Sequence, residues 1–193
     1  MNTNIKTTEG EKSMKKITVA TIVAGILTSG LMADGLIDID KVTPNYTLGI
    51  GGSAMDGGSV AGLFELDTKN KKSLNNVYLS HDIEIDKNYL SVSGKSVYQN
   101  GSHGVFGGVG YLKADKNGEI KEGAFGVVGL SETLPIGLVD TTFEAGYKFG
   151  NETKGFVSEL NVRNIVAPGG GLSLRYDNID GFDRVAAYAT VNF

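Results

Sequence analysis

Few residues of this sequence could do acid–base, nucleophilic or metal chemistry. The chain has two histidines, His81 and His103, and no cysteine, which excludes a thiol nucleophile, a thiolate metal site and a disulfide. Because neighbouring side chains on a strand point to opposite faces, His81 and Asp82 cannot form a catalytic dyad with each other. His103 follows a turn-like Asn-Gly-Ser stretch, where we expect a solvated imidazole. The sequence therefore predicts that the protein is not an enzyme.

Three other patterns lack a part that ligand binding requires. The stretch 177–181 is similar to the start of a calcium loop but has no terminal glutamate. The glycine-rich run 104–110 is followed by neither a helix nor a Lys-Ser/Thr pair, so it is not a phosphate loop. The two histidines are 22 residues apart and the acidic residues are scattered, which is not metal-ligand spacing. We expect no catalytic residue, no metal site and no cofactor.

The functional lead is a set of charged residues that alternate with apolar ones and share one face of their segments. These residues are Glu65, Asp82, Glu84, Lys95, Glu144, Glu159, Arg163 and Arg175. Four of them lie on three consecutive segments and could form a cross-strand salt-bridge network: Glu144, Glu159, Arg163 and Arg175. Enclosed charges must be paired or hydrated. The sequence therefore leaves two interpretations open, a network that plugs a narrow interior and a narrow water-filled channel for small solutes.

Strand-like segments must position these charges. They span roughly 45–54, 58–67, 75–86, 88–98, 103–114, 120–131, 138–149, 154–165, 171–178 and 184–193. The connections are short, polar and glycine-rich, and no segment after residue 33 has a helical period. Short connections at steady spacing indicate an up-and-down meander, which can close into a barrel without free edges. We expect an all-β fold, an antiparallel barrel of about ten strands, or of eight if the first strands are miscounted.

Alternation by itself does not say which face of the barrel is outside. A soluble barrel would enclose the apolar face, whereas a transmembrane barrel turns that face to lipid. The charged character of the opposite face, together with both ends of the chain, favours the transmembrane β-barrel. The three prolines are expected before the first strand (Pro44) and in turns (Pro135 and Pro168), with none inside a strand. If both termini are periplasmic, the two proline turns are periplasmic as well, and so is the long lysine-rich turn 67–76.

The beginning of the sequence is typical of an export signal. Met14 is followed by two lysines, an apolar stretch and small residues up to Ala33, a pattern that predicts a secretory signal peptide over 14–33 with cleavage after Ala33. An uncleaved anchor is the alternative. Residues 1–13 are interpreted as an overextended start, and 34–193 as a single barrel domain.

The end of the sequence is typical of a lipid-facing strand. From Val185 to Phe193 every second residue is apolar. We expect Phe193, with Val191 and Tyr188, to form the signal read by the machinery that assembles outer-membrane barrels. Ala189, between Tyr188 and Val191, has only a small side chain and is not assigned to this signal.

Composition bounds the partners. The chain has 18 basic and 22 acidic residues, a net charge of −4, which gives no basic footprint for nucleic acid. The expected partners are outer-membrane lipid and the barrel assembly machinery, and the barrel is expected to be a monomer in the outer membrane of a Gram-negative bacterium.

Several short pieces carry a family resemblance. They are residues 94–98 (GKSVY), 108–112 (GVGYL), 134–137 (LPIG), 144–149 (EAGYKF) and 188–193 (YATVNF). Together they make most of residues 45–193 resemble the YfaZ-like family of small outer-membrane proteins, and similar pieces occur in barrels of the OmpX and OmpW kinds. The resemblance implies an outer-membrane barrel and supplies no catalytic motif.

Overall fold

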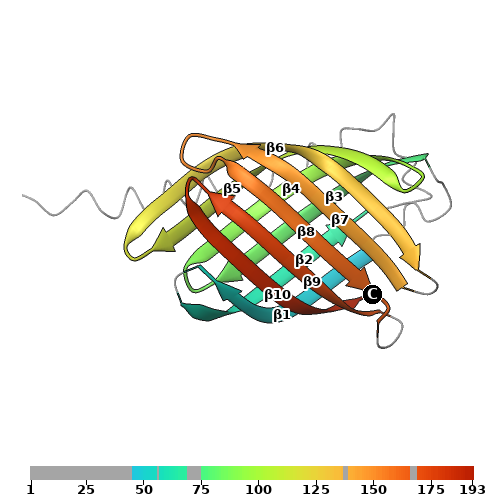
Figure 1. Cartoon of the computed structure of the whole chain (residues 1–193), viewed down its shortest axis with the longest axis horizontal. Coiled ribbons are helices and arrows are strands. Elements are labelled where there is room, and N and C mark those ends of the chain that lie inside the picture. The colour runs from blue at the N-terminus through green and yellow to red at the C-terminus, as the bar shows by residue number, and fades with distance from the viewer. Residues whose placement is uncertain (1–44, 56, 69–74, 137–138, 166–168) are drawn as a thin grey trace, which may run out of the picture.

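The fold is a closed, all-antiparallel β-barrel. A computed structural model describes residues 45–55, 57–68, 75–136, 139–165 and 169–193, and contains no helix in these ranges. The strands are β1 (Asn45–Ala54), β2 (Gly58–Asp67), β3 (Asn75–Asp86), β4 (Tyr89–Asn100), β5 (His103–Lys116), β6 (Glu119–Ile136), β7 (Val139–Phe149), β8 (Gly155–Arg163), β9 (Gly170–Ile179) and β10 (Phe182–Asn192). Each strand pairs with the next, and β10 pairs with β1 (Figure 1). The predicted up-and-down barrel of about ten strands is confirmed.

The barrel closes along the seam between β1 and β10. Their register runs from Thr47 opposite Asn192 to Ala54 opposite Val185. Beyond this ladder, Tyr46 and Phe193 exchange two backbone hydrogen bonds of 3.0 Å, and their rings stack with centroids 5.8 Å apart. The ten described strands therefore leave no sheet edge open, which removes the site at which edge strands aggregate.

Side chains alternate between a polar interior and an apolar exterior. On β10, Arg184 is 1% exposed, while the next residue, Val185, is 53% exposed. The same pattern holds around the ring, where Val60 and Leu130 are among the most exposed large apolar residues. This arrangement is the inverse of a soluble barrel, so the prediction that the apolar face points outward is confirmed and the alternative that encloses this face is wrong.

One predicted strand end is wrong. β6 was expected to end near residue 131 with Pro135 in a turn, but the strand continues to Ile136 and Pro135 is opposite Asp140 on β7. A proline is tolerated there because it is the next-to-last residue of the strand, where one missing N–H costs little of the ladder. Pro44 and Pro168 lie outside the described residues, as do the predicted start 1–13 and signal peptide 14–33.

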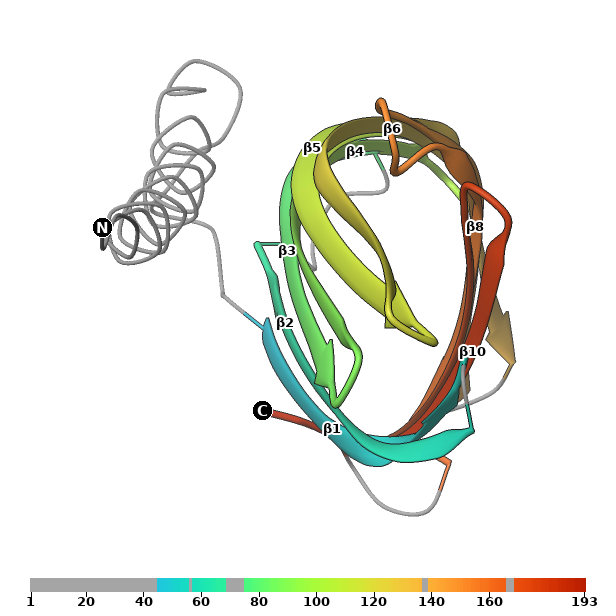
Figure 2. The same cartoon turned by 90° about the vertical axis from the view of Figure 1, so that its left-hand side faces the viewer.

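The two ends of the barrel differ. The end at which β1 starts and β10 finishes is called the terminal end, and it carries the β2–β3 connection that includes the long lysine-rich turn. At the opposite, distal end, the β5–β6 hairpin is built on the two longest strands and turns at Asn117 and Gly118. Both turn residues have positive φ, 55° and 84°, as an Asn-Gly hairpin turn requires. Figure 1 shows this hairpin extending beyond its neighbours, and Figure 2 shows it leaning across the distal opening.

Candidate functional site: the charged lumen

The lumen is lined by the charged face of the strands. The structure places all eight predicted residues inside the barrel, since each lies on the inward face of its strand: Glu65, Asp82, Glu84, Lys95, Glu144, Glu159, Arg163 and Arg175. Sequence reasoning missed seven further members, which the structure adds to the same interior: Asp67, Asp86, Tyr89, Lys148, Asp177, Arg184 and Tyr188. The alternation of side chains along a strand could have predicted them. Each lies an even number of residues from a predicted member or from a buried residue on the same strand, and so points to the same face.

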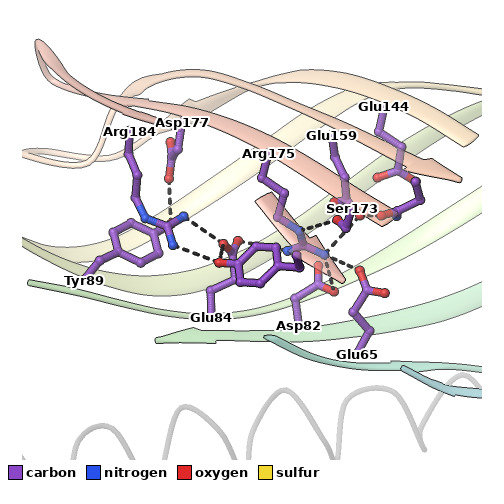
Figure 3. A network of polar contacts seen from close by, with 12 residues as sticks. Glu65, Asp82, Glu84, Tyr89, Glu144, Glu159, Ser173, Arg175, Asp177 and Arg184 are labelled. Atoms are coloured by element: carbon purple, nitrogen blue, oxygen red, sulfur yellow. Dashed lines mark hydrogen bonds and ion pairs between the residues drawn. The ribbon is translucent and has the colours of Figure 1, made fainter. Parts of the chain in front are cut away.

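Arg175 on β9 is the centre of the network (Figure 3). Its Nη1 donates to Glu84 Oε1 at 2.9 Å and its Nη2 donates to Glu159 Oε1 at 3.0 Å. Nη2 also binds Glu65 on β2 and lies 3.7 Å from Asp82 Oδ1. One guanidinium therefore holds carboxylates from three other strands, a geometry that suits its planar fork of donors.

Arg184 on β10 forms a second centre nearer the distal end. Its Nη1 donates to Glu84 Oε2 at 2.8 Å and its Nε donates to Asp86 Oδ2 at 3.2 Å. The guanidinium also lies over the Tyr89 ring, 3.8 Å from the centroid, and donates to the Tyr188 hydroxyl at 2.9 Å. Glu84 thus bridges the two arginines, which makes the two centres one network.

Two lysines complete the pairing from other walls of the lumen. Lys95 on β4 forms an ion pair with Glu144 on β7, and its Nζ lies 3.9 Å from Asp82 Oδ2. Lys148 on β7 forms an ion pair with Asp177 on β9, and the Tyr89 hydroxyl donates to the same carboxylate at 2.7 Å.

The predicted grouping of Glu144, Glu159, Arg163 and Arg175 is only partly right. The structure brings Glu159 and Arg175 together, but Glu144 pairs with Lys95, and Arg163 pairs with Asp67 at 3.2 Å and Glu65 at 3.8 Å. The reason is the register, which sets Glu144 directly opposite Glu159. Two carboxylates placed side by side repel each other, so each is stabilised by a basic side chain from another strand. Glu144 pairs with Lys95 and Glu159 with Arg175.

Carboxylates outnumber bases in this network. It contains eight carboxylates and five basic side chains. The carboxylates are Glu65, Asp67, Asp82, Glu84, Asp86, Glu144, Glu159 and Asp177, and the bases are Lys95, Lys148, Arg163, Arg175 and Arg184. Asp82 is the least well paired: its Oδ1 is buried without a hydrogen-bond partner. The network therefore has three more carboxyl groups than bases.

The wall formed by β4, β5 and β6 is apolar instead. Its buried side chains include Val97, Phe106, Leu112, Phe125 and Val127. Glycines on the same face make room for the rings. A Cβ on Gly129 would lie 2.3 Å from Phe106 Cζ, and one on Gly110 would lie 2.4 Å from Phe125 Cζ. Side chains from both walls thus fill most of the interior, as expected for a barrel of this size.

Two cavities lined by described residues lie between the charged and the apolar walls. The larger, of about 90 Å³, lies in the middle of the barrel and includes Ser91 and Ser93 in its lining. The smaller, of about 30 Å³, lies toward the terminal end, beside Ser80 and Arg163. The two cavities have three lining residues in common: Lys95, Glu144 and Glu159. The Lys95–Glu144 ion pair therefore lies between the two spaces.

The distal opening is covered by the β5–β6 hairpin. Lys121 on β6 lies 3.4 Å from Asp180, in the turn between β9 and β10. The Nζ atoms of Lys116 and Lys121 lie 5.5 and 5.6 Å from the Phe182 ring centroid. Strands β7 and β8 separate β6 from β9 in the barrel order, so these contacts cross the opening (Figure 2). Partial desolvation would raise the pKa of Asp180, but Lys154 and Lys121 outweigh it and hold this pKa below its ordinary value.

The two histidines lie away from the lumenal network. His81 is on the outward face of β3, next to Leu66 of β2, and the exposed His103 Nδ1 lies 2.5 Å from Glu132. Among the described residues no group of three or more acidic or histidine side chains is placed to hold a metal ion.

The residues of the predicted assembly signal lie on different faces of β10. Val191 and Phe193 are exposed on the outer face, whereas Tyr188 is fully buried in the lumen and donates to Glu84 at 2.9 Å. Ala189 is also exposed on the outer face, opposite Ile50 of β1. It shares this face with Val191 and differs from it only in the size of its side chain. An assembly signal read from outside the barrel would include Val191 and Phe193 but not Tyr188.

In the described part of the chain, no helix has the length and apolar composition to cross a membrane. Comparison of the chain with protein-family models, with curated proteins and with solved structures gave no match.

Proposed function

We propose that this protein is an integral outer-membrane β-barrel of a Gram-negative bacterium whose lumen is plugged by its own side chains. The mature barrel would follow export through the signal peptide predicted over 14–33 and insertion by the barrel assembly machinery. Its partners would be outer-membrane lipid and that machinery, and it would act as a monomer. The resemblance to the YfaZ-like family likewise implies an outer-membrane barrel.

The observation that carries this proposal is the pair of charged borders on the outer face of β5 and β6. His103 is opposite Glu132 near the terminal end, and Lys113 is opposite Glu122 near the distal end. Between these borders the outward residues are uncharged: Val105, Gly107, Val109 and Tyr111 on β5, and Ala124, Gly126, Val128 and Leu130 on β6.

The height of this uncharged band matches a bilayer. Lys113 is ten positions after His103, which is about 33 Å along a strand that rises 3.3 Å per residue. In a barrel whose strands tilt by about 40°, this length corresponds to about 25 Å along the axis, the height of the apolar band in outer-membrane barrels. Polar pairs that include charged side chains at both borders, with no charged residue between them, are what a lipid-facing surface requires.

The buried network supports the plug. Arg175 and Arg184 are almost completely buried, and each binds carboxylates from other strands. Such contacts hold opposite walls of the lumen together, while the apolar wall fills the remaining half. A structural barrel that closes itself in this way needs no separate plug domain.

The experiment that tests the proposal is fractionation combined with gel migration. The expressed full-length protein should be recovered in the outer-membrane fraction. It should also migrate differently before and after boiling, because a closed barrel keeps its shape in detergent until heated. Recovery in the soluble periplasmic fraction, with unchanged migration, would contradict the proposal.

One observation favours a second candidate function, the narrow channel for small solutes. The two lumenal cavities described above adjoin each other at Lys95, Glu144 and Glu159. Adjoining spaces in the lumen are what a narrow path for small solutes would need, whereas a lumen filled by side chains would not need them.

A further inference from the structure

We propose that the lumen is a closed, cation-selective path with two barriers, an internal latch and a distal lid. The latch is the ion pair of Lys95 and Glu144. The lid is the β5–β6 hairpin, residues 113–122. This inference rests on the proposed insertion into the outer membrane and adds to it a function that a plain plug would lack.

The path itself is given by the two cavities. The charged lining of the larger one is five carboxylates and three bases: Asp82, Glu84, Glu144, Glu159 and Asp177, with Lys95, Lys148 and Arg175. That of the smaller one is four carboxylates and two bases: Glu65, Asp67, Glu144 and Glu159, with Lys95 and Arg163. Both spaces are therefore rich in carboxylates, in a network with eight carboxylates against five bases. Narrow clefts of one charge sign in low-dielectric walls concentrate ions of the opposite sign, so the path would favour small cations.

The latch separates the two cavities. Lys95 and Glu144 come from β4 and β7, strands that are not neighbours in the barrel, so the bond between them crosses the lumen. The Lys95 Nζ also lies 5.4 Å from the Phe106 ring centroid, which places the ammonium group over a ring of the apolar wall. Both side chains line both cavities. Shortening the two together would join the spaces and remove one charge of each sign, and Asp82 would keep its ion pair with Arg175 after losing that with Lys95.

The lid covers the distal opening of the lumen, beyond the larger cavity (Figure 2). Fully buried Leu112 and Ala114 on the inner face of β5, and Ile179 and Phe182 opposite, form an apolar seal beneath the hairpin. Above this seal, the hairpin is held by the contacts of Lys121 with Asp180 and with the Phe182 ring. A charge reversal at Lys121 would set two anions against each other and remove the contact with the ring.

Single-channel recording on the refolded protein in planar bilayers tests the proposal. We compare the wild type, the latch variant (Lys95→Ala with Glu144→Ala), the lid variant Lys121→Glu, and the variant with all three changes. The matched control is Lys113→Glu, the same charge reversal on the outward face of the same hairpin, where Lys113 lies 3.7 Å from Glu122.

The expected result is that the wild type and Lys113→Glu stay closed and the combined variant opens. In a KCl gradient the reversal potential of the combined variant should shift toward that of K⁺, because its lumen keeps an excess of carboxylates. A combined variant that is inserted and heat-modifiable but does not conduct, or that prefers Cl⁻, overturns the proposal. Failure of the wild type to insert would instead contradict the outer-membrane function.

A second measurement, in detergent micelles, keeps the proposal testable if the combined variant does not fold. The chain has no cysteine, so Ser93→Cys in the larger cavity and Ser80→Cys in the smaller one can each be the only thiol. The latch variant should speed labelling of Cys at position 93 and leave that at position 80 unchanged. A cationic reagent should react about tenfold or more faster than an anionic one of the same size. Fast labelling of position 93 in the wild-type background, or no change in the variant, would contradict a closed path.

Discussion

Arg175 and Glu84 join two strands of the barrel that are not neighbours. The Nη1 atom of Arg175, on β9, lies 2.9 Å from Oε1 of Glu84, on β3. Glu84 binds Arg184 through its other oxygen, so one carboxylate links both arginines of the lumen. Because all three side chains are buried, none can exchange its partner for bulk water, and each depends on the other two.

Loss of the Arg175 guanidinium should therefore destabilise the barrel strongly. Arg175→Met leaves several buried carboxylates without their cation, and we expect a loss of about 3–5 kcal/mol in the free energy of unfolding. Urea titration of the refolded protein in micelles measures it. Lys113→Met is the control, because this outward ion pair is half exposed and should contribute about 0–1 kcal/mol. Equal midpoints for the two variants would show that the network does not hold the barrel together.

Removing a carboxylate together with Arg175 should cost less than the sum of the two single changes. Arg175→Met with Glu159→Gln eliminates one of the charges that the first change leaves unpaired, since the two side chains are 3.0 Å apart. We expect a coupling free energy of about 0.5–3 kcal/mol from the double-mutant cycle. Strict additivity would mean that the two residues do not interact in solution.

The glycines under the aromatic rings should be sensitive to a single methyl group. Gly129→Ala would bring a Cβ to 2.3 Å from Phe106 Cζ and 2.4 Å from the Ala145 carbonyl oxygen, so the ring and the neighbouring strand must both move. The expected cost is about 1–3 kcal/mol. Gly107→Ala is the matched control, since its nearest neighbour would be 3.9 Å away. Thermal unfolding followed by circular dichroism compares them, and a stable Gly129→Ala would argue against this packing.

The sequence predicted the walls of the barrel better than the contacts across it. Alternation fixes the face on which a residue lies, which is why Glu65, Glu84 and Arg175 were correctly expected to share an interior. Alternation does not fix which residues meet across the lumen, and Glu144 pairs with Lys95 rather than with Arg163. That choice depends on strand order and register around the whole ring, which no local pattern contains.

The lid and the strand end at Pro135 were missed for related reasons. A proline is usually a sign of a turn, but in β6 it occupies a terminal position where the lost N–H matters little. The bend of the β5–β6 hairpin across the opening depends on Phe182 and Asp180, which are more than fifty residues away in sequence. Only the closed barrel brings them to Lys121.

Substitutions at the last two residues, Asn192 and Phe193, should affect different properties: the first the stability of the folded barrel, the second its assembly in cells. The Asn192 side chain accepts a hydrogen bond from Thr47 Oγ1 at 2.6 Å and donates one to the Gly169 carbonyl at 3.0 Å. Asn192→Ala should therefore weaken the seam of the refolded protein by about 1–3 kcal/mol. Phe193→Ser should instead reduce the fraction of barrel assembled in cells, if the exposed Phe193 ring is read by the assembly machinery. Assembly reduced equally by both changes would contradict a special role for Phe193.

The strongest test of a lipid-facing surface compares two outward positions of β6 that water would treat alike. Val128 and Ile120 are 55% and 49% exposed on the outer face, but Val128 lies inside the uncharged band and Ile120 lies beyond Glu122. If the band is buried in a bilayer, Val128→Lys should cost about 2–4 kcal/mol and Ile120→Lys about 0–1 kcal/mol, because the penalty for a charge falls from the midplane to the interface. Unfolding in lipid vesicles measures both changes. In water either substitution on an exposed strand face should stay within about 0.5 kcal/mol, so equal and small effects in vesicles would mean that lipid does not contact this surface.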